Sequence, residues 1–180
     1  MQLRNIVLAS MMAALTAVGA YLHIPVGPVP IVLQNLFVLL AGLLLGPRWG
    51  LASIGVYVLV GACGLPVFAG GKGGLAALAG PTGGYLAGYV LAALVVGWVA
   101  QHGPRRLLWD ALAVIVGTLV IYGCGIPWLK LVTSWSWGKT LMVGLTPFVL
   151  GDAVKATAAV MLARVLRPMM DRGNPQQAYA

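Results

Sequence analysis

Long apolar runs, interrupted by glycine, proline and charged residues, make up most of this chain. The last of them, Pro147–Leu166, extends roughly 30 Å as a helix, which is the thickness of a bilayer's hydrocarbon core. Each run is interpreted as one helix and each cluster of breakers as a connection. We therefore expect six membrane-spanning helices in one domain, 1–180, near residues 6–24, 31–45, 49–64, 83–100, 107–123 and 147–166.

Composition indicates the same class of protein. Of the 180 residues, 61% are hydrophobic, only 8% are charged and none is glutamate. A water-soluble domain needs many more charged residues to cover its surface. The first apolar run is too long for a signal peptide and further runs follow it, so we expect it to be retained. The prediction is an all-α integral membrane protein.

The net charge of +8 does not indicate a nucleic-acid partner, because the basic residues lie at the ends of apolar runs and do not cluster with aromatic residues. Arginines and lysines fall at opposite ends of the runs. With six helices and both termini in the cytoplasm, all seven arginines lie inside, as the positive-inside rule requires. They are Arg4, Arg48, Arg105, Arg106, Arg164, Arg167 and Arg172, against Lys72, Lys130 and Lys139 outside.

In this orientation the inner connections, 46–48 and 101–106, are short. The outer connections are longer and irregular, at 25–30, 65–82 and 125–146. Irregular backbone near membrane depth is tolerated only where protein or a cavity covers it. We therefore expect a ligand site toward the outer face.

Asp152 and Lys155 are the most informative pair of residues, since both lie inside the last apolar run. A charge at membrane depth costs on the order of 3 kcal/mol, and residues three apart share a helix face. Thr146 and Pro147 are typical of a helix start, which places the pair about 7–12 Å below the outer surface. The pair suits a small polar ligand. The alternative is that it only neutralises itself and fixes helix packing.

The glycine-rich stretch Phe68–Tyr85 is the second candidate for ligand contact. Glycine allows tight backbone and exposes amide donors near a ligand. Within this stretch we predict Gly70, Gly71, Thr82 and Tyr85 as binding residues. It lacks the spacing of a phosphate-binding loop. A turn that merely packs the loop on the helices is the alternative.

Three further features come from amide and aromatic side chains and from small residues. Gln34, followed by Asn35, lies in the first turn of the second helix, where an amide can bind a ligand or join helices. Tyr122 precedes a tryptophan-rich loop that forms either an interfacial belt or a wall of the site. Small residues repeat every four positions on the first helix, which favours close packing on another helix or another protein; they are Ala9, Ala13 and Ala17.

No set of residues indicates catalysis. Asp110 follows Arg106 by four residues, which predicts an ordinary pair at a helix start. An intramembrane aspartyl protease needs a second buried aspartate, and Asp152 is the only aspartate expected at membrane depth. Cys63 and Cys124 are too few for a disulfide framework and have no metal-ligand spacing. We expect neither a metal nor a cofactor.

The chain resembles BioY, the biotin-specific substrate-binding subunit, or S-component, of energy-coupling-factor transporters. The resemblance rests on stretches that occur in order across most of the chain, with Asn35 standing where the family has threonine. They are Gly27–Gln34, Leu39–Arg48, Gly64–Gly74, Gly80–Tyr85 and Pro147–Lys155.

The resemblance implies a six-helix bundle in a bacterial or archaeal cytoplasmic membrane that captures biotin from outside. Asp152 and Lys155 match the family's signature ligand residues, and Ala9, Ala13 and Ala17 match its docking face for a transmembrane coupling subunit. That subunit joins two cytoplasmic ATPases. Some members are proposed to transport alone, as oligomers. The alternatives are an S-component for another vitamin, a membrane enzyme and a structural scaffold.

Biotin offers two ureido N–H donors, one ureido carbonyl, an apolar bicycle and a carboxylate. Asp152 can accept the N–H groups while Lys155 donates to the ureido oxygen. Alternatively, Lys155 pairs with the carboxylate. The first arrangement is favoured, because a polar ligand end that is buried deepest needs the most complete hydrogen bonding.

Overall fold

The computed structural model describes residues 2–25, 28–104 and 106–172, with backbone only at 171–172. Several parts of the predicted 1–180 domain lie outside this description. They are part of the loop 25–30, Arg105, the Arg172 side chain and the C-terminal tail. The elements, in chain order, are α1 (Gln2–Tyr21), β1 (His23–Ile24), β2 (Ile31–Val32), α2 (Gln34–Ala62), α3 (Leu75–Ala79), α4 (Gly83–His102), α5 (Leu107–Thr133), α6 (Trp137–Gly144) and α7 (Val149–Arg172).

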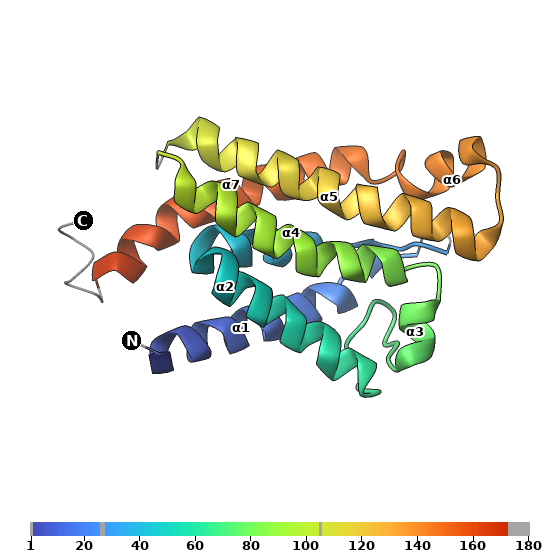
Figure 1. The fold of residues 1–180 in the computed structure, drawn as a ribbon, viewed down its shortest axis with the longest axis horizontal. Coiled ribbons are helices and arrows are strands. Elements are labelled where there is room, and N and C mark those ends of the chain that lie inside the picture. Colours follow the sequence, from blue (N-terminus) through green and yellow to red (C-terminus); the bar gives the residue numbers. More distant parts are fainter. Residues whose placement is uncertain (1, 26–27, 105, 173–180) are drawn as a thin grey trace.

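The long helices lie along the long axis of the molecule (Figure 1). α4 packs between α2 and α5, α1 packs on α2, and α7 packs on α2 and α5. The start of α1 and the end of α7 lie at the same end of the bundle, which we call the terminal end. α3 and α6 lie at the opposite end, which we call the loop end.

α2 is one continuous element by hydrogen bonding, yet its chain reverses direction at Gly46. Gly46 has φ 75° and ψ −176°, a conformation open essentially to glycine alone, and Pro47 follows it. A methyl group on Gly50 would lie 3.2 Å from the Cα of Gly42, whereas eight residues of straight helix span about 12 Å. The two halves of α2 therefore form a hairpin and lie within the predicted ranges 31–45 and 49–64. The first half begins only at Gln34, because Ile31–Val32 form β2, and the second ends at Ala62.

Within the described residues, four helices are long and apolar enough to cross a membrane, namely α1, α2, α4 and α5. α7 is not among them, because it carries charged side chains along its length. These include Asp152, Lys155, Arg164 and Arg167. The all-helical class predicted from the sequence is confirmed, since the elements of the described chain are helices except for the short β1–β2 hairpin.

α5 runs past the predicted end at Gly123 and continues through Pro127 to Thr133. Proline inside a helix costs about 3 kcal/mol, and the burial of the extension offsets this cost. Leu129 is fully buried, and Gly125 lies directly against the ring of Tyr85. The chain then turns at Ser134, which has a left-handed backbone, and forms α6 where the sequence predicted an irregular loop.

α7 begins at Val149 and not at the predicted Thr146–Pro147 start. Thr146 does not cap α7: its hydroxyl donates to the carbonyl of Leu141, at the end of α6. Its backbone N–H donates to the same carbonyl. Residues 145–148 therefore form a turn that links the two helices.

The small residues of α1 face α2. Ala9 and Ala13 are buried, while Ala17 is half-buried. The carbonyl of Ala9 accepts a hydrogen bond of 2.7 Å from the hydroxyl of Ser53. The sequence left open whether these small residues pack on another helix of the chain or on another protein. In the structure, Ala9 and Ala13 pack within the chain.

Asp110 is buried and pairs with Arg167 of α7, not with Arg106 as the spacing predicted. The Arg167 guanidinium donates to Asp110 at 2.8 Å and to the carbonyl of Leu43 at 3.0 Å. Arg106 instead occupies the N-cap of α5 and its side chain is exposed. The i,i+4 rule fails because Asp110 points inward, toward α7 and the end of the first half of α2.

Candidate functional site

Asp152 and Lys155 lie on one face of the first turns of α7, as the three-residue spacing predicts. Both are buried, with exposed fractions of 5% and 8%. The Lys155 ammonium donates to Oδ1 of Asp152 at 2.7 Å. The α7 face carrying this pair packs toward α2 and α5, which supply the next partners.

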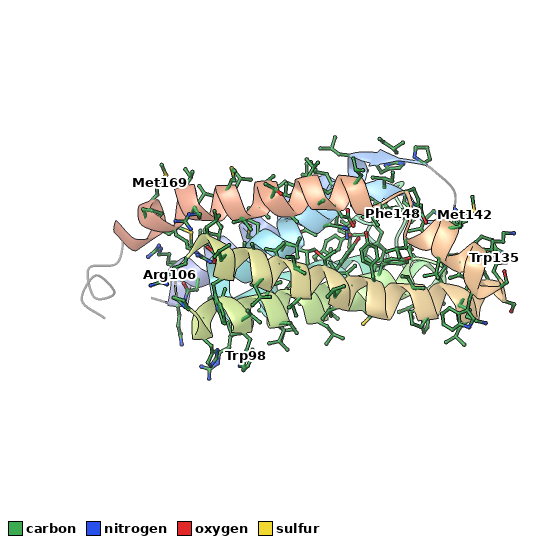
Figure 2. All side chains as sticks on the ribbon, turned by 90° about the horizontal axis from the view of Figure 1, so that it is seen from above. Trp98, Arg106, Trp135, Met142, Phe148 and Met169 are labelled. Carbon is green, nitrogen blue, oxygen red and sulfur yellow. The ribbon has the colours of Figure 1, made fainter. Side chains whose placement is uncertain are left out.

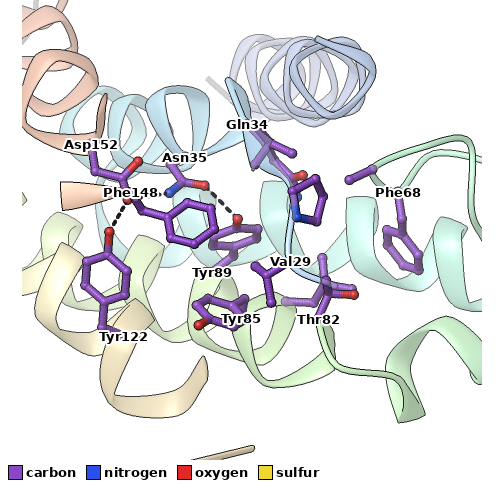
Figure 3. Close-up of a pocket in the computed structure, with 14 residues that line it drawn as sticks. Val29, Gln34, Asn35, Phe68, Thr82, Tyr85, Tyr89, Tyr122, Phe148 and Asp152 are labelled. Carbon is purple, nitrogen blue, oxygen red and sulfur yellow. Dashed lines mark hydrogen bonds between the residues drawn. The ribbon is translucent and has the colours of Figure 1, made fainter. Parts of the chain in front are cut away.

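The second oxygen of Asp152 is held by two donors from other helices (Figure 3). The hydroxyl of Tyr122 donates to Oδ2 at 2.5 Å, and the amide of Asn35 donates to it at 3.1 Å. The hydroxyl of Tyr89 in turn donates to the amide oxygen of Asn35 at 2.6 Å. α2, α4, α5 and α7 therefore meet in a single hydrogen-bonded network around one carboxylate.

This network forms part of the wall of a cavity toward the loop end (Figure 3). The remaining wall is largely apolar. The lining residues are Val29, Pro30, Val32, Gln34, Asn35, Phe68, Ala69, Thr82, Tyr85, Leu86, Tyr89, Tyr122, Phe148 and Asp152. An apolar cavity with a few convergent polar groups is typical of a small-molecule site.

The structure brings most of the predicted binding residues to this cavity. Asp152, Gln34, Thr82, Tyr85 and Tyr122 line it. Lys155 stands behind Asp152 and reaches the site through its ion pair.

Gly70 and Gly71 do not line the cavity. Both have positive φ, and they form a tight turn in which Phe68 and Lys72 pair as an isolated bridge. The effect of the turn is to hold Phe68 and Ala69 at the cavity wall. In the structure these two glycines form a turn, which was the alternative to direct contact with a ligand.

Two predicted residues have their polar groups engaged in holding loops. The amide nitrogen of Gln34 donates to the hydroxyl of Tyr57 at 2.9 Å, and that hydroxyl donates to the carbonyl of Val67. The hydroxyl of Tyr85 donates to the carbonyl of Gly144 at 2.8 Å. These bonds tie the loop before α3 and the end of α6 to the helices that surround the cavity.

Sequence reasoning missed Tyr89, Tyr57 and the apolar residues Val29, Leu86 and Phe148. Tyr89 follows Tyr85 by four residues, so the helical period could have placed both on one face of α4. No local signal identifies the other residues. They reach the site through the packing of distant segments.

The side chains of the cavity suit the binding of a small, partly polar ligand. Asp152 and Lys155 neutralise each other and present an acceptor and a donor in a setting from which water is largely excluded. Tyrosine and amide groups add further donors and acceptors. The cavity is narrow, with a volume of about 40 Å³.

Fold and cavity together define a multi-pass helical membrane protein with a candidate small-molecule site near one end of the bundle. The BioY family model matches residues 1–172. The chain therefore belongs to the BioY family.

Individual relatives agree with this assignment. The probable biotin transporter BioY of Pyrococcus horikoshii is 41% identical over 93% of this chain and 98% of its own length. The biotin transporter BioY of Thermotoga maritima is 40% identical over the same shares of the two chains. The crystal structure of the S-component for biotin from an ECF-type ABC transporter superposes with a TM-score of 0.87, at 30% identity, over 93% of this chain and 92% of that one.

Proposed function

We propose that the chain captures biotin and takes part in its uptake, as the substrate-binding S-component of an energy-coupling-factor transporter. The observation that carries the proposal is the buried Asp152 carboxylate at the cavity wall, which Lys155, Asn35 and Tyr122 hold by hydrogen bonds. Relatives that are named biotin transporters support the choice of ligand. No enzymatic activity is expected.

The bundle crosses the membrane six times in this proposal. α1, α4, α5 and α7 each cross once, and α2 crosses twice because it reverses at Gly46. Both termini lie in the cytoplasm, since Arg4, Arg48 and Arg164 then lie inside. The loop end, with the cavity, faces outward and receives the ligand.

Biotin binds with its ureido ring toward Asp152 and Lys155. Asp152 accepts the ureido N–H groups, Lys155 donates to the ureido oxygen, and the bicycle packs on apolar wall residues such as Phe148 and Val29. The glycine turn at Gly70–Gly71 contributes by placing Phe68 and Ala69, and Gln34, Thr82 and Tyr85 complete the wall.

Competition with biotin methyl ester tests which end of biotin meets Lys155. The ester keeps the ureido ring and lacks the carboxylate charge. Unchanged affinity is expected, and a loss of about tenfold or more would assign Lys155 to the carboxylate instead. A panel of other vitamins in the same assay tests the alternative ligand class, and tighter binding of any of them than of biotin would overturn the proposal.

The partners in transport are a transmembrane coupling subunit and two cytoplasmic ATPases. Because Ala9 and Ala13 pack within the chain, the coupling subunit would meet α1 mainly through neighbouring exposed side chains, such as Val7 and Met11. The alternative is transport by the chain alone as an oligomer. Biotin uptake by cells that contain this chain without the other subunits separates the two cases.

A further inference from the structure

A second hollow lies at the terminal end of the bundle, remote from the ligand cavity. The turn in the middle of α2 and the last turn of α4 enclose it, and its volume is about 390 Å³. Its lining residues are Leu45, Pro47, Arg48, Trp49, Trp98, Gln101 and His102. Nothing in the proposed capture of biotin uses these residues.

The hollow is built on a close approach of α4 to the turn of α2. A methyl group on Gly97 would lie 2.4 Å from the carbonyl carbon of Gly46, so only glycine allows the two segments to touch. The Gln101 side chain lies directly over Gly46, where a Cβ would meet its Nε2 at 2.4 Å. The walls of the hollow are therefore held in place by backbone contact.

Arg48 gives the hollow a charged hydrogen-bond donor that suits an anion. Arg48 is exposed and presents a guanidinium, which binds phosphate with two parallel hydrogen bonds. Nδ1 of His102 donates to the carbonyl of Trp98 at 2.8 Å, so Nε2 of the neutral ring is an acceptor and Arg48 remains the donor for an anion. The residues that line the hollow, all within the described part of the chain, include no acidic side chain.

The remaining lining side chains are apolar and continue toward the surrounding lipid. Trp98 is 57% exposed and projects away from the bundle at the end where Arg106 also lies (Figure 2). Leu91, seven residues before it on the same face of α4, is 45% exposed. A hollow with an exposed arginine that opens onto an apolar track matches a phospholipid, whose phosphate and acyl chain are joined.

We propose that this hollow binds the phosphate of an anionic phospholipid, such as phosphatidylglycerol. Arg48 is the principal donor, and Trp98 packs beside the part of the acyl chains nearest the headgroup. Basic pockets between helices on the cytoplasmic side are known to bind lipid headgroups of this kind. The orientation proposed above places the hollow in the cytoplasmic leaflet. The bound lipid would fix the turn of α2 against α4.

Native mass spectrometry of the delipidated protein tests the proposal directly. The protein is titrated with phosphatidylglycerol and with phosphatidylcholine of identical acyl chains. We expect phosphatidylglycerol to be retained at least about fivefold better, the factor that corresponds to one arginine near a lipid surface. Equal retention of the two lipids would overturn the proposal.

Two variants with the same change of charge locate the site. Arg48→Gln is expected to abolish the preference for phosphatidylglycerol. Arg164→Gln removes an exposed arginine of α7 outside the hollow and is expected to keep it. An equal loss in both variants would show diffuse attraction and contradict a site.

Glycerol 3-phosphate in excess distinguishes a lipid from a free anion, since it carries the phosphate without acyl chains. We expect it to leave the bound lipid in place. Displacement of the lipid would show an anion site that does not require the apolar track. Biotin binding is followed in parallel as an independent readout, so failure of the lipid site is distinguishable from failure of the proposed function.

Discussion

Asp152 is the residue at which the contacts of the ligand site converge. One of its carboxylate oxygens accepts from Lys155, and the other accepts from Tyr122 and Asn35. A buried carboxylate is tolerated only when it is paired and hydrogen-bonded. Three donors from three helices meet that requirement and fix the direction in which the carboxylate faces the cavity.

Tyr122→Phe removes one of these donors and leaves the ring in place. We expect biotin affinity to fall by roughly tenfold, because a hydrogen bond to a charged group contributes about 1.5–3 kcal/mol. Equilibrium binding of radiolabelled biotin measures the change. Thr157→Val is the control, since its hydroxyl donates to the carbonyl of Ala153 on the exposed side of α7, outside the cavity. A gain in affinity would show instead that the ligand replaces Tyr122 at the carboxylate.

At the scale of residues, the sequence predicted the charged pair, Asp152 and Lys155, but not the polar side chains from other helices that hydrogen-bond to it. Asp152 and Lys155 are identified by the cost of charge within an apolar helix and by their spacing. Asn35 and Tyr89 could not be connected to Asp152, because their bonds depend on how α2, α4 and α7 pack. For Gly70 and Gly71, composition indicates conformational freedom only, and the structure uses it for a turn.

At the scale of elements, Arg167 joins three helices at the terminal end. It pairs with Asp110 of α5 and donates to the Leu43 carbonyl, near the end of the first half of α2. Such carbonyls in the last turn of a helix have no partner within their own helix. Arg167 therefore holds α7 in register with the bundle, far along the same helix from Asp152.

Asp110→Asn is expected to lower the free energy of unfolding by about 2–3 kcal/mol, because it leaves the Arg167 charge without its partner in a largely buried place. For a chain of this length the melting temperature in detergent falls by roughly 5–10 °C. The double variant Asp110→Leu with Arg167→Met should recover much of that loss. A double variant less stable than Asp110→Asn would contradict this account of the pair.

Gly97→Ala tests the contact between α4 and the turn of α2. The added methyl group would lie 2.4 Å from backbone atoms, so we expect a loss of about 1–3 kcal/mol in the free energy of unfolding. Gly55→Ala is the control, because nothing lies within 4 Å of its position. In a helix that change should stabilise slightly. Similar effects of both substitutions on melting temperature would contradict the close approach.

The sequence predicted helix interiors better than helix ends. Apolar periods and breakers indicate where helices occur, yet α5 passes through Pro127 because its extension is buried against α4. The sequence predicts Thr146 as the N-cap of α7, but its hydroxyl donates a hydrogen bond to the Leu141 carbonyl of α6. In both cases a tertiary contact outweighs a local signal, and such contacts cannot be read from spacing.

On the scale of the whole molecule, the bundle has two ends with different chemistry. The terminal end carries arginines and the proposed lipid site, whereas the loop end carries the cavity and the small elements α3 and α6. The positive-inside rule predicts that the terminal end faces the cytoplasm. The proposed capture of biotin from outside depends on this orientation.

Labelling of cysteine in intact cells tests the orientation. Cys63 is exposed at the end of α2, near the loop end, so a membrane-impermeant maleimide should label it from outside. His102→Cys in a chain without Cys63 and Cys124 should label only after the membrane is permeabilised. The reverse pattern would contradict the proposed orientation.

The central claim is that a biotin site is formed around Asp152, and equilibrium binding of radiolabelled biotin to the purified chain tests it most directly. The unmodified chain should bind biotin, and Asp152→Asn should weaken binding by roughly tenfold to a hundredfold. Thr157→Val, an exposed change on the same helix, should leave binding unchanged. Absence of binding by the unmodified chain, or equal affinity of Asp152→Asn, would contradict the account.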